Sequence, residues 1–229
     1  LSHLKDLGIG RGKGKLGDCL SEIIAAFNAY SEELVDPAKL VEARRASAAD
    51  PDEVAVAEAY GRYRDLLKEE RLLDFAGLQR EAYRILSDNR SVRDAIQARF
   101  DYVMVDEFQD TNDVQYQLIQ MLASEHQNLF VVGDDDQTIY TFNGARNEFI
   151  LDFDNKYPLA TTVTLDVNYR STSGIVGLGN EVIARNEARK KKTLQSTKTS
   201  ELPPQFWTPA TTDEEAEGII SHIEAVIAE

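Results

Sequence analysis

Hydrophobic positions in the middle of the chain fall into two short continuous runs separated by a helical spacing. The runs Tyr102–Val105 and Leu129–Val132 each end abruptly at acidic residues. Short runs rich in β-branched residues and free of alternation are typical of strands buried on both faces of a parallel sheet. The pattern therefore predicts a strand–helix–strand unit, in which the intervening helix has an apolar face at Val114, Leu118, Met121 and Leu122.

The first 99 residues show helical spacing throughout and predict an all-helical region. One apolar stripe begins at Leu20 and ends at Phe27. Asp36-Pro37 and Asp50-Pro51 each place a capping carboxylate before a proline, as at the start of a helix. A further helix is expected to begin at Leu73-Asp74-Phe75.

Beyond a boundary at Tyr157-Pro158, the pattern changes again. Thr161–Val167 alternates between apolar and polar residues and predicts a strand. The helix after it is expected to end in the basic residues Arg189–Lys192, which the helix dipole would favour there. We interpret this cluster as a solvated helix end.

The last part of the chain predicts one more strand and one more helix. Thr193–Pro204 has the composition of a polar linker, and Gln205–Thr208 is a short predicted strand. Thr212 and Glu215 have the spacing of a capping box, which predicts an amphipathic helix running to the end of the sequence.

Composition restricts the class of protein. The chain has 229 residues, of which 42% are hydrophobic and 28% charged, as in ordinary globular proteins. No apolar run approaches the roughly 20 residues of a membrane helix, and the first residues lack the apolar core of a secretory signal. The single cysteine, Cys19, excludes an internal disulfide and indicates the cytoplasm.

Charge gives no support for nucleic-acid binding. The net charge of −15 argues against a protein that wraps nucleic acid over its whole surface. Positive charge is concentrated locally, at Arg11, Lys13 and Lys15 near the start and at Arg185 with Arg189–Lys192 later. Binding to DNA therefore has to be argued from motifs rather than from composition.

Candidate chemistry lies where the two central strands are expected to end. In open parallel sheets, active sites form beyond the carboxyl ends of the strands. Asp106, Glu107, Gln109 and Asp110 follow the first strand, and Asp134–Gln137 follows the second. An Asp-Glu pair at such an end suits a nucleoside triphosphatase, where one carboxylate holds Mg²⁺ and its neighbour activates water. The glycine- and lysine-rich stretch 8–17 does not match the phosphate-loop pattern G-x-x-x-x-G-K-[ST].

Three longer motifs carry a resemblance to a known family. VDEFQDTN (105–112), VVGDDDQTIYTFNGA (131–145) and LDVNYRST (165–172) resemble, in order and spacing, motifs II, III and IV of the UvrD/Rep family of superfamily 1 DNA helicases. The resemblance implies an α/β fold, part of a RecA-like P-loop NTPase parallel sheet with an all-helical inserted subdomain. It divides the chain into the inserted subdomain (1–72), the later half of the first motor domain (73–158) and the beginning of the second (159–229).

The resemblance also implies an ATP site with Mg²⁺. Asp106 corresponds to the Mg²⁺ ligand, and Glu107 corresponds to the catalytic base. Gln137 corresponds to the γ-phosphate sensor that links hydrolysis to DNA contacts. Arg170 corresponds to the arginine that reaches the γ-phosphate from the second domain, and Tyr169 corresponds to the ring that stacks on adenine.

DNA contacts are implied for the end of the second motif. Tyr140 and Phe142 correspond to a platform on which single-stranded DNA stacks, and ordinary packing in a turn is the alternative for both rings. Asn143 stands where the family frequently has arginine, which puts a phosphate or strand contact in doubt. Single-stranded and duplex DNA are the implied partners, in repair or replication.

We expect the chain to be the middle of a longer helicase, because it lacks a phosphate loop, lacks the family's later motifs and begins at Leu1. Such a fragment would be inactive alone. One alternative is a complete, non-catalytic relative that binds DNA or a partner. Another is a two-metal nuclease that uses the carboxylates after the two strands; this alternative leaves Gln137 and Asn168-Tyr169-Arg170 unexplained.

Overall fold

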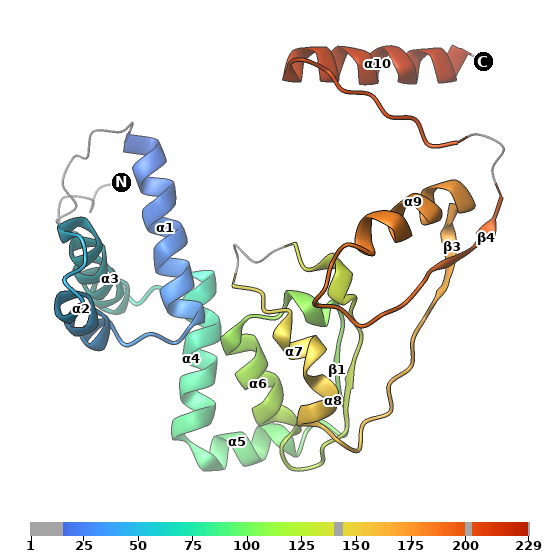
Figure 1. The fold of residues 1–229 in the computed structure, drawn as a ribbon. Coiled ribbons are helices and arrows are strands. Elements are labelled where there is room, and N and C mark those ends of the chain that lie inside the picture. The colour runs from blue at the N-terminus through green and yellow to red at the C-terminus, as the bar shows by residue number, and fades with distance from the viewer. Residues whose placement is uncertain (1–15, 140–143, 200–202, 229) are drawn as a thin grey trace. The chain divides into compact units, whose positions relative to one another are not determined.

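The computed structural model describes residues 16–139, 144–199 and 203–228. It divides into two compact units, Leu1–Ala160 and Thr161–Glu229. Helices are combined with two small parallel sheets, one in each unit (Figure 1). None of the described helices is both long and apolar enough to cross a membrane.

The predicted helical region is confirmed for the described residues. It contains five helices, and both predicted Asp caps are present: Asp36 accepts a hydrogen bond from the Lys39 N–H and Asp50 from the Asp52 N–H. Asp74 also caps a helix, by accepting from the Gly77 N–H, a role that was not predicted from the sequence. The helices are α1 (Leu16–Glu32), α2 (Pro37–Ala46), α3 (Pro51–Glu69), α4 (Phe75–Asp88) and α5 (Arg90–Gln97).

A buried polar network joins α1 and α3 to α4. Tyr60 is fully buried beside Phe27, and its hydroxyl lies 3.0 Å from Ser31 Oγ. Arg80 on α4 donates to the same Ser31 oxygen at 3.0 Å. Tyr63 donates to Asp74 Oδ2 at 2.8 Å, and burial together with this bond raises the pKa of Tyr63 well above its ordinary range. Helices α1 and α3 are therefore fixed against α4.

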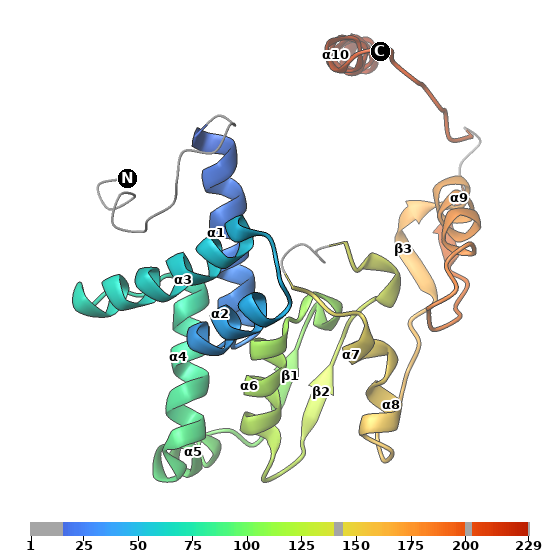
Figure 2. The ribbon, with the colours of Figure 1, turned by 60° about the vertical axis from the view of Figure 1, so that its left-hand side comes forward.

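The predicted strand–helix–strand unit is also confirmed. Strands β1 (Val103–Val105) and β2 (Leu129–Val131) pair in parallel, with Val103 opposite Leu129 and Val105 opposite Val131. Helix α6 (Asp113–Ala123) connects them and packs against β1 (Figure 2). It begins with a full capping box, in which Asn112 and Gln115 each accept a backbone N–H of the other.

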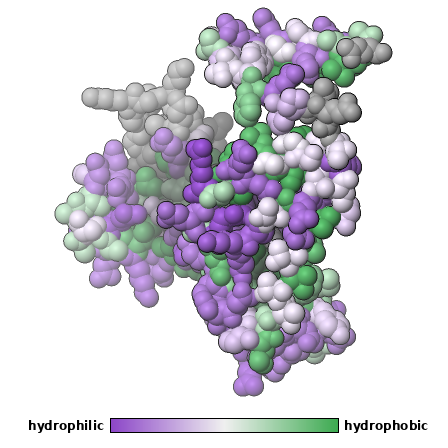
Figure 3. All heavy atoms as spheres, turned by 45° about the vertical axis from the view of Figure 1, so that its right-hand side comes forward, coloured by the Kyte–Doolittle hydropathy of each residue, from purple (hydrophilic) through white to green (hydrophobic). Residues whose placement is uncertain are grey.

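Only one face of this sheet is covered by the described residues, so the expectation of burial on both faces is wrong here. Val105 and Val131 pack into a cluster with the buried side chains of Phe108, Tyr116 and Ile150. Two short helices, α7 (Glu148–Leu151) and α8 (Phe153–Lys156), complete that cluster. On the opposite face, Met104 and Phe130 are 73% and 57% exposed. Figure 3 shows hydrophobic residues among hydrophilic ones on one face of the molecule.

The second unit corrects several predictions. Its strands are β3 (Val167–Thr172) and β4 (Gln195–Lys198), which pair in parallel around helix α9 (Ser173–Ile183). Of the strand predicted at Thr161–Val167, only Val167 belongs to β3; residues 161–166 form no regular structure, and no described strand pairs with them. The predicted linker 193–204 contains β4, whose polar residues pair with β3 through the backbone and through side chains such as Ser196, whose Oγ donates to Ser171 O at 2.6 Å.

The end of the second unit differs in detail from its prediction. Helix α9 ends at Ile183, so the basic residues 189–192 follow the helix instead of ending it. Residues 205–208 form no strand, and Trp207 lies over Gly218, where a Cβ atom would clash with its ring. Helix α10 (Thr212–Ala228) is capped one residue earlier than predicted, since Thr211 Oγ1 accepts from the Glu214 N–H.

Candidate active site

The carboxyl ends of β1 and β2 lie side by side, as the sequence predicts for parallel strands. Pairing continues past the strands, because the Val132 N–H donates to Val105 O at 2.8 Å and the Phe108 N–H donates to Val132 O at 2.9 Å. Each strand then enters a short 3₁₀ turn, η1 (Phe108–Asp110) or η2 (Asp135–Gln137). The two acidic segments are thus held next to each other.

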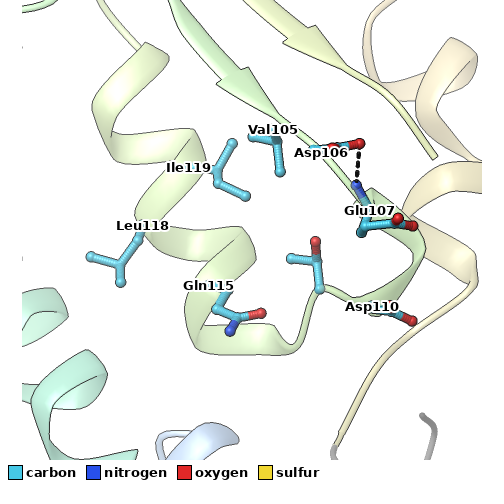
Figure 4. A pocket seen from close by; sticks show the side chains of 8 residues that line it. Val105, Asp106, Glu107, Asp110, Gln115, Leu118 and Ile119 are labelled. Atoms are coloured by element: carbon cyan, nitrogen blue, oxygen red, sulfur yellow. Dashed lines mark hydrogen bonds between the residues drawn. The ribbon is translucent and has the colours of Figure 1, made fainter. Parts of the chain in front are cut away.

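Asp106 and Glu107 border an open pocket beside the end of β1 (Figure 4). Asp106 is exposed, and its Oδ1 accepts a hydrogen bond from the Glu107 N–H at 2.9 Å. The pocket has a volume of about 470 Å³ and is lined by polar groups on the loop side and by apolar side chains of β1 and α6. Its other lining residues are Val105, Asp110, Thr111, Gln115, Leu118 and Ile119.

Glu107 has a left-handed backbone conformation, with φ of +50°. For a residue other than glycine this costs about 1–2 kcal/mol, and such strain is often found at functional sites. The next residue holds the turn in place: Phe108 is fully buried, bonded to Val132 through its N–H, and its ring meets Phe153 edge to face. The Glu107 carboxylate is held in turn by Gln109, whose Nε2 donates to Glu107 Oε2 at 2.7 Å.

Gln109 also reaches the loop after β2. Its side chain is 1% exposed, and its Oε1 accepts a hydrogen bond from the Asp134 N–H at 2.9 Å. This approach requires glycine at position 133, because a Cβ atom there would lie 2.6 Å from Gln109 Oε1 and 3.1 Å from the Phe108 nitrogen. The sequence pattern assigned no role to either residue; the only signal was an amide placed two residues after a candidate base.

Gln137 is exposed at the end of η2 and is linked to the start of that turn. Its Nε2 donates to Asp134 Oδ2 at 2.7 Å, and Asp134 Oδ1 accepts the Asp136 N–H at 3.1 Å. Carboxylate oxygens of Asp134, Asp135 and Asp136 lie within 4.8 Å of one another. No described cluster of three or more potential ligands combines them with Asp106 or Glu107, so the arrangement that a two-metal nuclease needs is not found among the described side chains.

The remaining predicted site residues lie on β3 or outside the described residues. Arg170 was expected to leave the end of a strand, but it lies within β3, with its N–H bonded to Asn168 Oδ1 at 3.0 Å. Its side chain is exposed, as is that of Tyr169, and no ion pair between described residues involves Arg170. Tyr140, Phe142 and Asn143 fall in the stretch 140–143, outside the described residues.

Comparison with known families agrees with these motifs. Residues 4–158 match the UvrD/REP helicase N-terminal domain, and residues 163–229 match the UvrD-like helicase C-terminal domain. The chain therefore belongs to the UvrD/REP helicase family, and the resemblance drawn from the sequence is confirmed. The break between the two matches falls at residues 159–162, and the two compact units meet at Ala160 and Thr161.

Individual relatives show the same similarity. The chain is 40% identical over 178 residues to the putative ATP-dependent DNA helicase YjcD of Bacillus subtilis, covering 78% of this chain and 24% of that protein. It is 38% identical over 200 residues to the ATP-dependent DNA helicase PcrA of Staphylococcus aureus, covering 87% and 27%. A probable DNA helicase II homolog of Mycoplasma capricolum is 37% identical over 193 residues, covering 84% and 26%. The chain spans about a quarter of the length of these curated relatives.

Proposed function

We propose that this chain is the central part of an ATP-dependent DNA helicase and carries part of its ATP site and part of its DNA path. One observation carries the proposal: Asp106 and Glu107 end one parallel strand directly beside the turn that bears Gln137. In this proposal β1, α6 and β2 belong to a RecA-like P-loop NTPase sheet. Residues 1–72 are the helical insertion, 73–158 the later half of the first motor domain and 159–229 the start of the second.

The first strand end provides the hydrolytic groups. An exposed carboxylate at a strand end suits a hard cation, so Asp106 would hold Mg²⁺. The bound ion would neutralise charge on the phosphates. Glu107, held by Gln109, would orient the attacking water and accept its proton.

Contacts with the nucleotide from other segments complete the proposed site. Gln137 would sense the γ-phosphate through the turn it shares with Asp134. Arg170 and Tyr169, both exposed on β3, would reach the γ-phosphate and the adenine respectively. The relatives YjcD and PcrA are named as ATP-dependent DNA helicases, which supports the proposed nucleotide contacts.

The full-length protein is expected to hydrolyse ATP, to be stimulated by single-stranded DNA and to unwind duplex DNA. The 229-residue chain alone is expected to show no turnover, since its sequence holds no phosphate loop to cradle the β- and γ-phosphates. Steady-state ATPase and strand-displacement assays on both proteins are the test. A full-length protein that binds DNA without any turnover would instead be a non-catalytic relative.

Single-stranded DNA is proposed to stack on Tyr140 and Phe142. Stacking on aromatic rings contributes about 1–3 kcal/mol per base and does not depend on sequence. Replacing both residues with alanine in the full-length protein should therefore weaken binding of a short oligonucleotide by at least about tenfold, measured by fluorescence anisotropy. Unchanged affinity together with a lower Tm would show that the two rings pack within the protein.

A further inference from the structure

We infer that Gln109 is a positioning residue that couples the Glu107 carboxylate to the turn carrying Gln137. The inference rests on the proposed function, in which Glu107 acts on water and Gln137 lies near the γ-phosphate. It concerns a residue that touches neither nucleotide nor DNA. Gln109 would act only through the two groups to which it is bonded.

The side chain of Gln109 is used at both ends. Its Nε2 donates to Glu107 Oε2 at 2.7 Å, and its Oε1 accepts from the Asp134 N–H at 2.9 Å. The glutamine amide provides a donor and an acceptor on one short planar group, whereas an ionised glutamate has no donor and methionine has no N–H or O–H, so neither can reproduce both bonds. The two partners lie 27 residues apart in the sequence and on the ends of different strands.

The surroundings leave this amide little freedom to move. Gln109 is almost fully buried, and the preceding Phe108 is completely buried in the cluster beneath the sheet. Gly133 allows the Gln109 oxygen to approach so closely that any Cβ at that position would overlap with it. A side chain held in this way would transmit a shift of the loop after β2 directly to the Glu107 carboxylate.

The loop after β2 carries Gln137, the proposed sensor of the γ-phosphate. Asp134 supplies its N–H to Gln109 and its Oδ2 to the Gln137 amide at 2.7 Å. A hydrogen-bonded path therefore runs from Glu107 through Gln109 and Asp134 to Gln137. Displacement of Gln137 by a phosphate or by a change in the loop would alter the position of the proposed base.

Hydrogen exchange at the Asp134 amide tests the link without requiring any hydrolysis. In the full-length protein, Gln109→Met should speed exchange at this amide by about tenfold, the factor expected for one lost hydrogen bond. Gln109→Glu keeps an acceptor for the same N–H, so its exchange should stay close to that of wild type. Unchanged exchange in Gln109→Met would overturn the link.

Kinetics test whether the link positions Glu107. Both variants lose the donor to Glu107, so each should lower kcat by roughly 10- to 100-fold, as a small misplacement of a catalytic group does. Nucleotide Kd should stay within about threefold, because Gln109 contributes no group to binding. A kcat within about twofold of wild type in Gln109→Met would overturn the positioning role.

Gln97→Met is the matched control. Gln97 is a second buried glutamine, 4% exposed, and its Nε2 donates to Met121 O and to Ser124 Oγ, away from the strand ends. This substitution should lower Tm much as Gln109→Met does and leave kcat unchanged. An equal loss of kcat in both variants would mean that Gln109 has only a structural role.

Failure of the proposed function would look different. Absence of turnover in the wild-type full-length protein would refute the helicase assignment while exchange at Asp134 still responded to Gln109→Met. Normal turnover in wild type, with no response of exchange or kcat to Gln109 substitution, would refute the positioning role alone.

Discussion

Replacing Arg170 with lysine in the full-length helicase is expected to lower kcat by about 10³-fold or more while nucleotide binding stays within a few-fold of wild type. An arginine that reaches the γ-phosphate stabilises charge that develops as the phosphoryl group is transferred. Lysine keeps the charge but loses the planar fork of donors. ATPase rates at saturating single-stranded DNA, together with a nucleotide titration, provide the measurement.

The structure makes Arg170 available for this role. Its backbone is fixed within β3 by Asn168, and by Lys198, whose Nζ donates to Arg170 O at 3.1 Å. The alternative to a phosphate contact is a structural ion pair between Arg170 and Asp166. No such ion pair is found among the described side chains. Arg185→Lys, an exposed arginine of the same unit, is the matched control and should keep normal kcat. Near-normal kcat in Arg170→Lys with a slightly lower Tm would exclude the phosphate contact.

Strong local signals explain which parts of the fold were predictable. The run ending at Val105 and the run ending at Val132 could be recognised as strands because each is a short continuous run of apolar residues that stops at acidic ones. Asp36 and Asp50 marked helix starts because an aspartate can cap the first turn and the proline that follows it has the backbone angle of a first helical residue. In each case the residues that define the element also provide its stabilising contacts.

The second unit was harder to predict because the pairing of β3 with β4 does not depend on a pattern of hydrophobic side chains. Strand β4 reads Gln-Ser-Thr-Lys, and it pairs with β3 through backbone hydrogen bonds and through polar side chains such as Ser196 and Lys198. Conversely, Val163 and Leu165 alternate as in a strand but are 75% and 77% exposed, and they belong to neither of the sheets that the described residues form. Alternation of apolar and polar residues predicts a strand with one buried face. In this segment no described residues cover that face.

The candidate site was predictable in its charged groups and not in the groups that position them. Asp106 and Glu107 are visible in the sequence because they directly follow a hydrophobic run, and the amide of Gln137 is visible because it lies in a known motif. Gln109 and Gly133 gain their roles from a contact between segments about 25 residues apart, and local patterns carry no information on that contact.

Glu107→Gln in the full-length helicase is expected to reduce kcat by about 10²- to 10⁴-fold, the usual contribution of general base catalysis. The amide has nearly the same shape as the carboxylate and can still accept the bond from Gln109, but it cannot take a proton from water. Nucleotide affinity should change little. Glu125→Gln makes the same chemical change at an exposed position after α6 and should leave kcat unaltered.

Combining Glu107→Gln with Gln109→Met separates the two roles further. Residues that act as a unit give strongly non-additive losses. If Gln109 acts only by holding the Glu107 carboxylate, removing it from an enzyme that already lacks the base should cost little more, and kcat of the double variant should match that of Glu107→Gln within about threefold. Full additivity of the two losses would show that Gln109 contributes to turnover by a route that does not pass through Glu107. Normal kcat in Glu107→Gln itself would contradict the assignment of the base.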